Sequence, residues 1–145
     1  MMAAALLDTN VLFASASAHD EYHGRSREII RGIDHGALPD AIITNYVVAE
    51  TLNLSGEKLG ADAANQMLDR LIGGAHFQIG HAPKTDFTAA QALFRRHTEL
   101  TFVDATIAAY LDREDIEYLY SFDDDFDVVD GLTRLDTVTN PFDRE

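Results

Sequence analysis

Residues 3–14 read AAALLDTNVLFA, and this stretch decides which fold the chain can adopt. Its first five residues are apolar without interruption, as in a strand that is buried on both faces of a sheet. Asp8, Thr9 and Asn10 follow directly, and the apolar residues after them favour a helix. The stretch therefore predicts a buried strand, a short polar turn and a helix, with an acidic side chain where the strand ends.

The same alternation of strand and helix continues along the chain. Short apolar runs favour strands at residues 41–44, 77–80 and 117–120, with a weaker candidate at 135–138. Between them, apolar side chains at helical spacing occupy residues 26–36, 45–54, 61–74, 85–97 and 104–113. This alternation predicts a parallel sheet with helices on both faces and right-handed crossovers. In such a sheet, ligands bind beyond the carboxyl ends of the strands.

Length and composition favour one domain over residues 1–145, without a linker or low-complexity tract. The chain has no cysteine, which excludes disulfides, zinc–thiolate sites and thiol nucleophiles. Its start lacks the basic segment of a signal peptide, and Asp8 interrupts the apolar run. We therefore expect a cytoplasmic protein without a membrane span.

The formal net charge of -14 is large for 145 residues. Such a surface repels nucleic acid at long range, so a phosphate contact needs metal ions or a local group of arginines. The candidates for such a group are Arg25, Arg27, Arg31, Arg95 and Arg96, although a solvated helix explains them equally well. Adaptation to a salty cytoplasm and a basic partner protein are two further explanations of the acidity.

Four acidic positions follow different predicted strands or begin a helix. Asp8 ends the first strand, Glu50 lies among apolar residues after the second, and Asp104 begins an apolar helix. Asp123 is the first aspartate of the run SFDDDFD, residues 121–127, after the fourth strand. Each has an ordinary explanation: Asp8 can cap a helix, Thr101 and Asp104 can form a capping box, and an acidic run can be a solvated turn.

Taken together, these acids are expected at one edge of the sheet, where their charges repel. Two like charges 4 Å apart cost about 4 kcal/mol at intermediate dielectric, which a divalent cation or a raised pKa relieves. Oxygen ligands suit Mg²⁺ or Mn²⁺, and such ions assist phosphodiester hydrolysis. An EF-hand does not fit, because counting back from Gly131 puts Phe126 at its first ligand position. Asn10 stands where a phosphoaspartate hydrolase would have its second acid, and no phosphate-binding glycine loop is present.

Four motifs, in this order, resemble the PIN-domain ribonucleases and in particular the VapC-type toxins of toxin–antitoxin pairs. They are LLDTNVLFA at 6–14, VVAETLN at 47–53, LTFVDATIAAY at 100–110 and YSFDDDF at 120–126. The resemblance implies a three-layer α/β/α PIN fold around a mostly parallel sheet of four or five strands. It also implies Mg²⁺- or Mn²⁺-dependent endonucleolytic cleavage of RNA.

The resemblance assigns roles to particular side chains. The acidic quartet would be Asp8, Glu50, Asp104 and Asp123. Asp8, Asp104 and Asp123 would bind the metal, and Glu50 would hold a metal-bound water or a second ion. The supporting positions would be Thr9, Asn10 and Ser121, which orient the acids, and Asp125 as a fifth acid. Ser121 stands where threonine is more usual, and we expect Asp124 and Asp127 to face solvent.

The resemblance also implies partners: an RNA substrate, a cognate antitoxin and a second copy in a homodimer. A basic antitoxin side chain among the acids would suit so acidic a protein. Two alternatives stay open. The chain could be a non-catalytic PIN module that binds RNA or serves as a scaffold, or a PIN nuclease of RNA processing without a toxin role.

Overall fold

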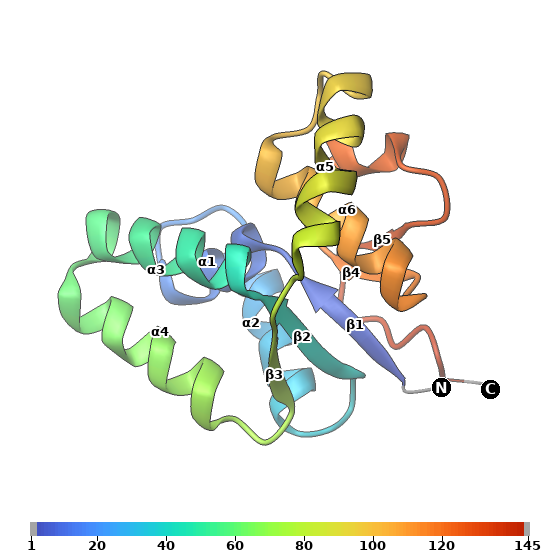
Figure 1. Ribbon diagram of the computed structural model, residues 1–145. Coiled ribbons are helices and arrows are strands. Elements are labelled where there is room, and N and C mark those ends of the chain that lie inside the picture. The colour runs from blue at the N-terminus through green and yellow to red at the C-terminus, as the bar shows by residue number, and fades with distance from the viewer. Residues whose placement is uncertain (1–2, 144–145) are drawn as a thin grey trace.

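A computed structural model describes residues 3–143, which form a five-stranded sheet with helices on both sides. The strands are β1 (Ala4–Leu7), β2 (Asp40–Thr44), β3 (Phe77–Gly80), β4 (Tyr118–Tyr120) and β5 (Thr133–Leu135). Their order across the sheet is β3-β2-β1-β4-β5, and every neighbouring pair is parallel. Figure 1 shows β1 beside β2 near the middle of the molecule. The predicted parallel sheet is confirmed.

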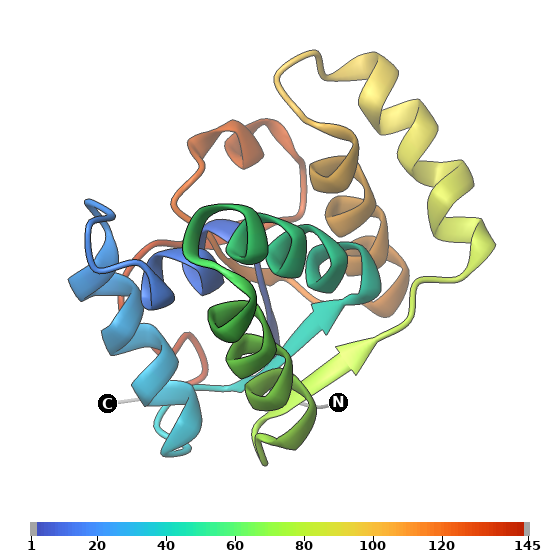
Figure 2. The same ribbon diagram turned by 90° about the vertical axis from the view of Figure 1, so that its left-hand side faces the viewer.

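The helices connect the strands in two groups. The first consists of α1 (Thr9–Ala16), α2 (His23–Asp34), α3 (Asn45–Leu59) and α4 (Ala61–Gly73). The second consists of α5 (Lys84–Arg96) and α6 (Phe102–Glu114), and a 3₁₀ turn, η1 (Asp124–Val128), follows β4. Because the chain moves from β1 to β3 and then crosses back to β4, right-handed crossovers place the two groups on opposite faces. Figures 1 and 2 show the resulting α/β/α layers.

The core lies on both faces of the central strands. All four residues of β1 are buried, as are Ile42 and Ile43 of β2 and Leu119 and Tyr120 of β4. The continuous apolar run that opens the chain is therefore explained by its central place in the sheet. No helix among residues 3–143 is both long and apolar enough to cross a membrane.

Local chemistry sets several boundaries. The Thr44 hydroxyl accepts a hydrogen bond from the Val47 amide and caps α3. Gly60 ends α3 and begins α4 with φ 101°, a conformation that favours glycine. This turn folds the two helices into the hairpin that extends from the body of the molecule (Figure 1). The structure also lengthens α3 beyond the predicted 45–54, to Leu59.

The fifth strand lies earlier than predicted. It covers Thr133–Leu135 instead of residues 135–138 and pairs Thr133 with Tyr118 and Leu135 with Tyr120. Since β4 is only three residues long, the ladder ends there, with the Ser121 amide donating to the Leu135 carbonyl over 3.0 Å. Val138 then lies outside the sheet and is 44% exposed. The weaker strand signal at residues 135–138 therefore gave the wrong bounds for this strand.

Candidate metal centre

The predicted acids gather where β1 and β4 lie side by side and the chain leaves them in opposite directions. Such a switch point leaves a crevice at the carboxyl edge of a parallel sheet. Asp8 directly follows β1, and its amide donates to the Tyr120 carbonyl over 3.0 Å, which continues the pairing with β4. Ser121 directly follows β4, so the two polar turns begin next to each other.

The Asp8 carboxylate is held from two sides. Oδ1 accepts a hydrogen bond from the Thr9 amide and Oδ2 from the Ser121 hydroxyl, each over 2.8 Å. The first bond caps α1, as the capping explanation predicted, and Asp8 is 4% exposed. Asn10 completes the arrangement, since its Nδ2 lies 3.3 Å from the Ser121 hydroxyl and its Oδ1 accepts from the Phe122 amide over 3.2 Å. The carboxylate therefore has a fixed orientation.

Asp104 enters from the other helical layer, in the first turn of α6. Its Oδ2 accepts from the Thr101 amide over 3.1 Å, and its own amide donates to the Thr101 hydroxyl over 3.2 Å. This is the predicted capping box, which leaves Asp104 only 7% exposed. The structural and functional explanations are compatible here, because the cap holds the carboxylate rigidly at the edge of the sheet.

Glu50 lies in the second turn of α3 and is half-buried. Its Oε1 accepts a hydrogen bond from the Thr9 hydroxyl over 2.5 Å. Thr9 itself is buried and begins α1 directly after Asp8. The bond therefore ties the side chain of α3 to the turn that carries Asp8.

Asp123 follows β4 and caps the 3₁₀ turn η1. Its amide donates to the Ser121 hydroxyl over 3.0 Å, and its Oδ1 accepts from the Asp125 amide over 2.9 Å. Within residues 3–143, the one group of three side chains whose possible ligand atoms all lie within 4.8 Å of one another is Asp123, Asp124 and Asp125. Asp8 and Asp104 lie outside this tight group.

Electrostatics links the acids in the crevice. Burial raises the pKa of Asp8 from its ordinary 3.8 to about 7; the Ser121 hydrogen bond lowers it, and the charges of Asp104 and Glu50 raise it further. Burial also raises the pKa of Asp104 to about 6, against the Thr101 bonds, while the charges of Asp123 and Glu50 add to the increase. The four predicted acids are therefore close enough to oppose one another's ionisation.

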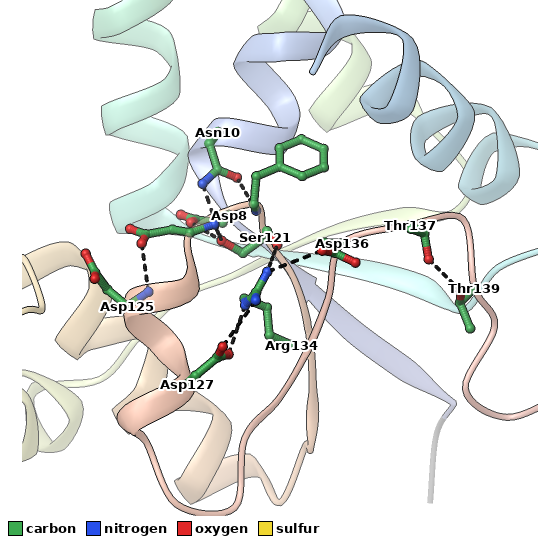
Figure 3. A network of polar contacts seen from close by, with 11 residues as sticks. Asp8, Asn10, Ser121, Asp125, Asp127, Arg134, Asp136, Thr137 and Thr139 are labelled. Carbon is green, nitrogen blue, oxygen red and sulfur yellow. Dashed lines mark hydrogen bonds and ion pairs between the residues drawn. The ribbon is translucent and has the colours of Figure 1, made fainter. Parts of the chain in front are cut away.

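The acidic run makes contacts that the sequence did not predict. Asp124 is exposed, as predicted, but it belongs to the tight carboxylate group. Asp127 is exposed as well, as predicted, and Arg134 forms a two-bond fork with it over 2.9 and 3.2 Å. Arg134 was not predicted at all (Figure 3). A single basic residue in a weak strand carries no sequence signal that would have identified it.

The donor set suits a hard divalent cation. It consists of carboxylates and hydroxyls without sulfur or histidine, which favours Mg²⁺ or Mn²⁺ over zinc or copper. A cation would also stabilise the ionised forms of Asp8 and Asp104, whose raised pKa values reflect buried and crowded negative charge. The residues present therefore fit such an ion.

The fold and this crevice define a class of protein: a three-layer α/β/α domain with carboxylates gathered at the switch point of a parallel sheet. The PIN domain family matches residues 5–132, and the chain belongs to this family. None of the curated proteins compared with the chain matches it.

Solved structures of toxins and toxin–antitoxin complexes are similar to this chain. Mycobacterium tuberculosis VapC20, described as a toxin that cleaves the sarcin-ricin loop, is 25% identical, with a TM-score of 0.75 over 86% of this chain and 94% of that chain. A toxin–antitoxin complex from Klebsiella pneumoniae is 21% identical, with a TM-score of 0.64, and the match covers 94% of this chain and 98% of that chain. VapBC2 from Rickettsia felis, bound to promoter DNA, is 14% identical, with a TM-score of 0.66, and the match covers 91% of this chain and 97% of that chain. The last two similarities concern the fold alone.

Proposed function

We propose that the chain is a single PIN domain that hydrolyses RNA phosphodiester bonds as a metal-dependent endoribonuclease. The observation that carries the proposal is the meeting of Asp8, Glu50, Asp104 and Asp123 at the β1–β4 switch point. Membership of the PIN family and the similarity to VapC20, described as a toxin that cleaves the sarcin-ricin loop, support this proposal.

Asp8, Asp104 and Asp123 would hold a Mg²⁺ or Mn²⁺ ion, with Asp124 and Asp125 as further carboxylates beside it. A bound divalent ion supplies a polarised phosphoryl oxygen and a water of lowered pKa. Ser121 keeps Asp8 aimed and Thr101 keeps Asp104 aimed, so neither carboxylate has to reorient during the reaction. Glu50, held by Thr9, would orient the attacking water or accept its proton.

The acidity of the chain bears on how RNA reaches this crevice. The side chains of Arg25, Arg27, Arg31, Arg95 and Arg96 are exposed on α2 and α5. With a net charge of -14, these arginines are candidates for phosphate contacts on those helices, and binding through them should weaken steeply with salt.

We further propose that the protein acts as the toxin of a toxin–antitoxin pair, restrained by an antitoxin and assembled as a homodimer. The similarity to VapC20 and to the fold of toxin–antitoxin complexes supports this reading. A basic antitoxin segment would find a complementary negative crevice, in which Asp8 and Asp104 are crowded acids. Growth arrest on expression of the chain alone, relieved by the protein of a neighbouring reading frame, tests the toxin role.

Cleavage of a labelled RNA tests the enzymatic proposal. We expect cutting with Mg²⁺ or Mn²⁺, none with EDTA, and none by Asp8→Asn, which keeps the shape of the side chain but removes its charge. Asp69→Asn is the matched control, because Asp69 is an exposed aspartate of α4 outside the crevice. If Asp8→Asn cuts as fast as the wild type, the site is wrong. If the pure wild type binds RNA but never cuts it, the chain is a non-catalytic binding module.

A further inference from the structure

Arg134 contacts both ends of the acidic loop, which we define as residues 121–127. It is the middle residue of β5, and its side chain is 16% exposed. The match to the PIN family ends at residue 132, before β5 begins, so the family assignment attaches no role to this arginine.

The guanidinium group of Arg134 divides its donors between the two ends. At the far end of the loop, Nε donates to Asp127 Oδ1 over 2.9 Å and Nη2 donates to Oδ2 over 3.2 Å. At the near end, Nη1 donates to the Ser121 carbonyl over 3.3 Å, and it lies 3.7 Å from an Asp136 carboxylate oxygen. Figure 3 shows the group between Asp127 on one side and Ser121 on the other.

The loop between these two ends holds the tight carboxylate group. Ligand atoms of Asp123, Asp124 and Asp125 lie within 4.8 Å of one another, where like charges repel strongly. Inside the loop, two hydrogen bonds oppose this repulsion: Asp123 amide to Ser121 hydroxyl, and Asp125 amide to Asp123 carboxylate. Arg134, whose own side chain is 16% exposed, joins residue 121 to residue 127 and adds a permanent positive charge beside the loop.

We propose that Arg134 is a positioning residue, which holds the acidic loop in the conformation where its carboxylates converge and thereby sets the affinity for a divalent cation. The inference rests on the proposed function, since that function makes these carboxylates cation ligands. Arg134 acts through Asp127 and the Ser121 carbonyl. The same Ser121 bonds Asp8 through its hydroxyl, so the fork also supports the backbone of a residue that orients the central acid.

The competing explanation is an ordinary ion pair that contributes only to global stability. The chain offers a matched control for it, because Arg113 forms the same kind of fork with Asp86, over 2.6 and 3.1 Å. That pair joins α5 to α6, outside the acidic loop. A variant of Arg113 therefore removes a forked arginine without touching residues 121–127.

The experiment compares full-length wild type with Arg134→Gln, Arg134→Lys and Arg113→Gln. Amide hydrogen exchange is measured without metal, and Mn²⁺ binding is measured by calorimetry. In Arg134→Gln we expect the amides of Asp123 and Asp125 to exchange about tenfold faster while β1 keeps its protection. The Mn²⁺ dissociation constant should rise about tenfold. Arg134→Lys keeps the charge but cannot fork, so both effects should be intermediate.

Arg113→Gln should lower the melting temperature while leaving exchange in the acidic loop and the Mn²⁺ dissociation constant at wild-type values. The proposal is overturned if Arg134→Gln changes neither loop exchange nor Mn²⁺ affinity, or if Arg113→Gln changes both equally. Should Arg134→Gln not fold, Arg134→Lys and Asp127→Asn supply the same comparison. RNA cleavage separates the two proposals: an Arg134-dependent Mn²⁺ site without cleavage refutes the ribonuclease, whereas cleavage with an unchanged loop in Arg134→Gln refutes the positioning role.

Discussion

The Ser121 hydroxyl donates a hydrogen bond to Oδ2 of Asp8 over 2.8 Å, across 113 positions of sequence. It also accepts from the Asp123 amide over 3.0 Å, so one buried hydroxyl joins the turn after β1 to the acidic loop after β4. The bond lowers the pKa of Asp8 against the larger effect of burial, which raises it. Ser121 thus favours the ionised form of Asp8, the form that binds a cation.

Removal of this hydroxyl should weaken cation binding without unfolding the chain. We expect Ser121→Ala to raise the Mn²⁺ dissociation constant and lower the RNA cleavage rate, each by roughly tenfold or more, as for other partners that orient a metal ligand. Ser121→Thr keeps the hydroxyl and should stay close to the wild type. Calorimetry and a cleavage time course measure the two quantities. Wild-type affinity in Ser121→Ala would show that Asp8 needs no such support.

The raised pKa of Asp8 predicts how pH affects the metal-free protein. The pKa is about 7 in the folded chain against an ordinary 3.8, so the folded state binds this proton more tightly than the unfolded state. The stability that the bound proton contributes is fully present below about pH 4 and is lost as the pH rises through about 7, by at most about 1.4 kcal/mol per pH unit. Asp104, with a folded pKa of about 6, acts in the same direction.

Denaturant unfolding in EDTA from about pH 5.5 to about pH 8 checks this slope. The wild type should lose stability relative to Asp8→Asn as the pH rises, because the asparagine variant cannot titrate at this position. The difference should shrink in saturating Mn²⁺, which stabilises the ionised wild-type site by binding the folded state. Parallel pH profiles for the two proteins in EDTA would contradict the assigned shift.

The Asp86–Arg113 fork predicts a stability effect remote from the crevice. Asp86 has a side chain that is 2% exposed, whereas that of Arg113 is 35% exposed and lies over the Tyr110 ring at 5.1 Å. Arg113→Ala leaves a buried carboxylate unpaired and should lower the free energy of unfolding by about 3 kcal/mol. Asp86→Asn in the same background should recover part of the loss by removing that charge. Equal stabilities of wild type and Arg113→Ala in urea would show that the fork contributes little.

The position of Glu50, held by the Thr9 hydroxyl, predicts that this residue affects the rate of RNA cleavage more than the affinity for Mn²⁺. Glu50 accepts a hydrogen bond from the Thr9 hydroxyl, next to Asp8, and lies outside the tight carboxylate group. We expect Glu50→Gln to lower kcat by about 100-fold while changing the Mn²⁺ dissociation constant much less, because a residue that orients water or accepts its proton acts on the chemical step. Steady-state kinetics with a short RNA measures kcat. A large loss of Mn²⁺ affinity with unchanged kcat would make Glu50 a principal ligand instead.

Local patterns in the sequence predicted much of this molecule. The features that were missed depend on contacts between different segments of the chain. The uninterrupted apolar run before Asp8 indicates a strand buried on two faces, and the spacing of Thr101 and Asp104 indicates a helix cap. Both are local features of the sequence, so both were predicted correctly. The start of β5 was misplaced because its register depends on pairing with β4, which no local alternation encodes. Arg134 and Asp127 meet across a strand and a turn, and such a pairing has no signature in a single sequence.

The dependence of RNA cleavage on Mn²⁺ concentration in wild type, Asp104→Asn and Asp69→Asn tests the central claim most directly. We expect the wild type and Asp69→Asn to reach half-maximal cleavage at the same Mn²⁺ concentration. Asp104→Asn should need at least about tenfold more Mn²⁺ or lose cleavage altogether, because it removes one of the buried charges that the cation would neutralise. Identical Mn²⁺ dependence in all three proteins, or cleavage that persists in EDTA, would contradict a metal-dependent nuclease centre at this edge of the sheet.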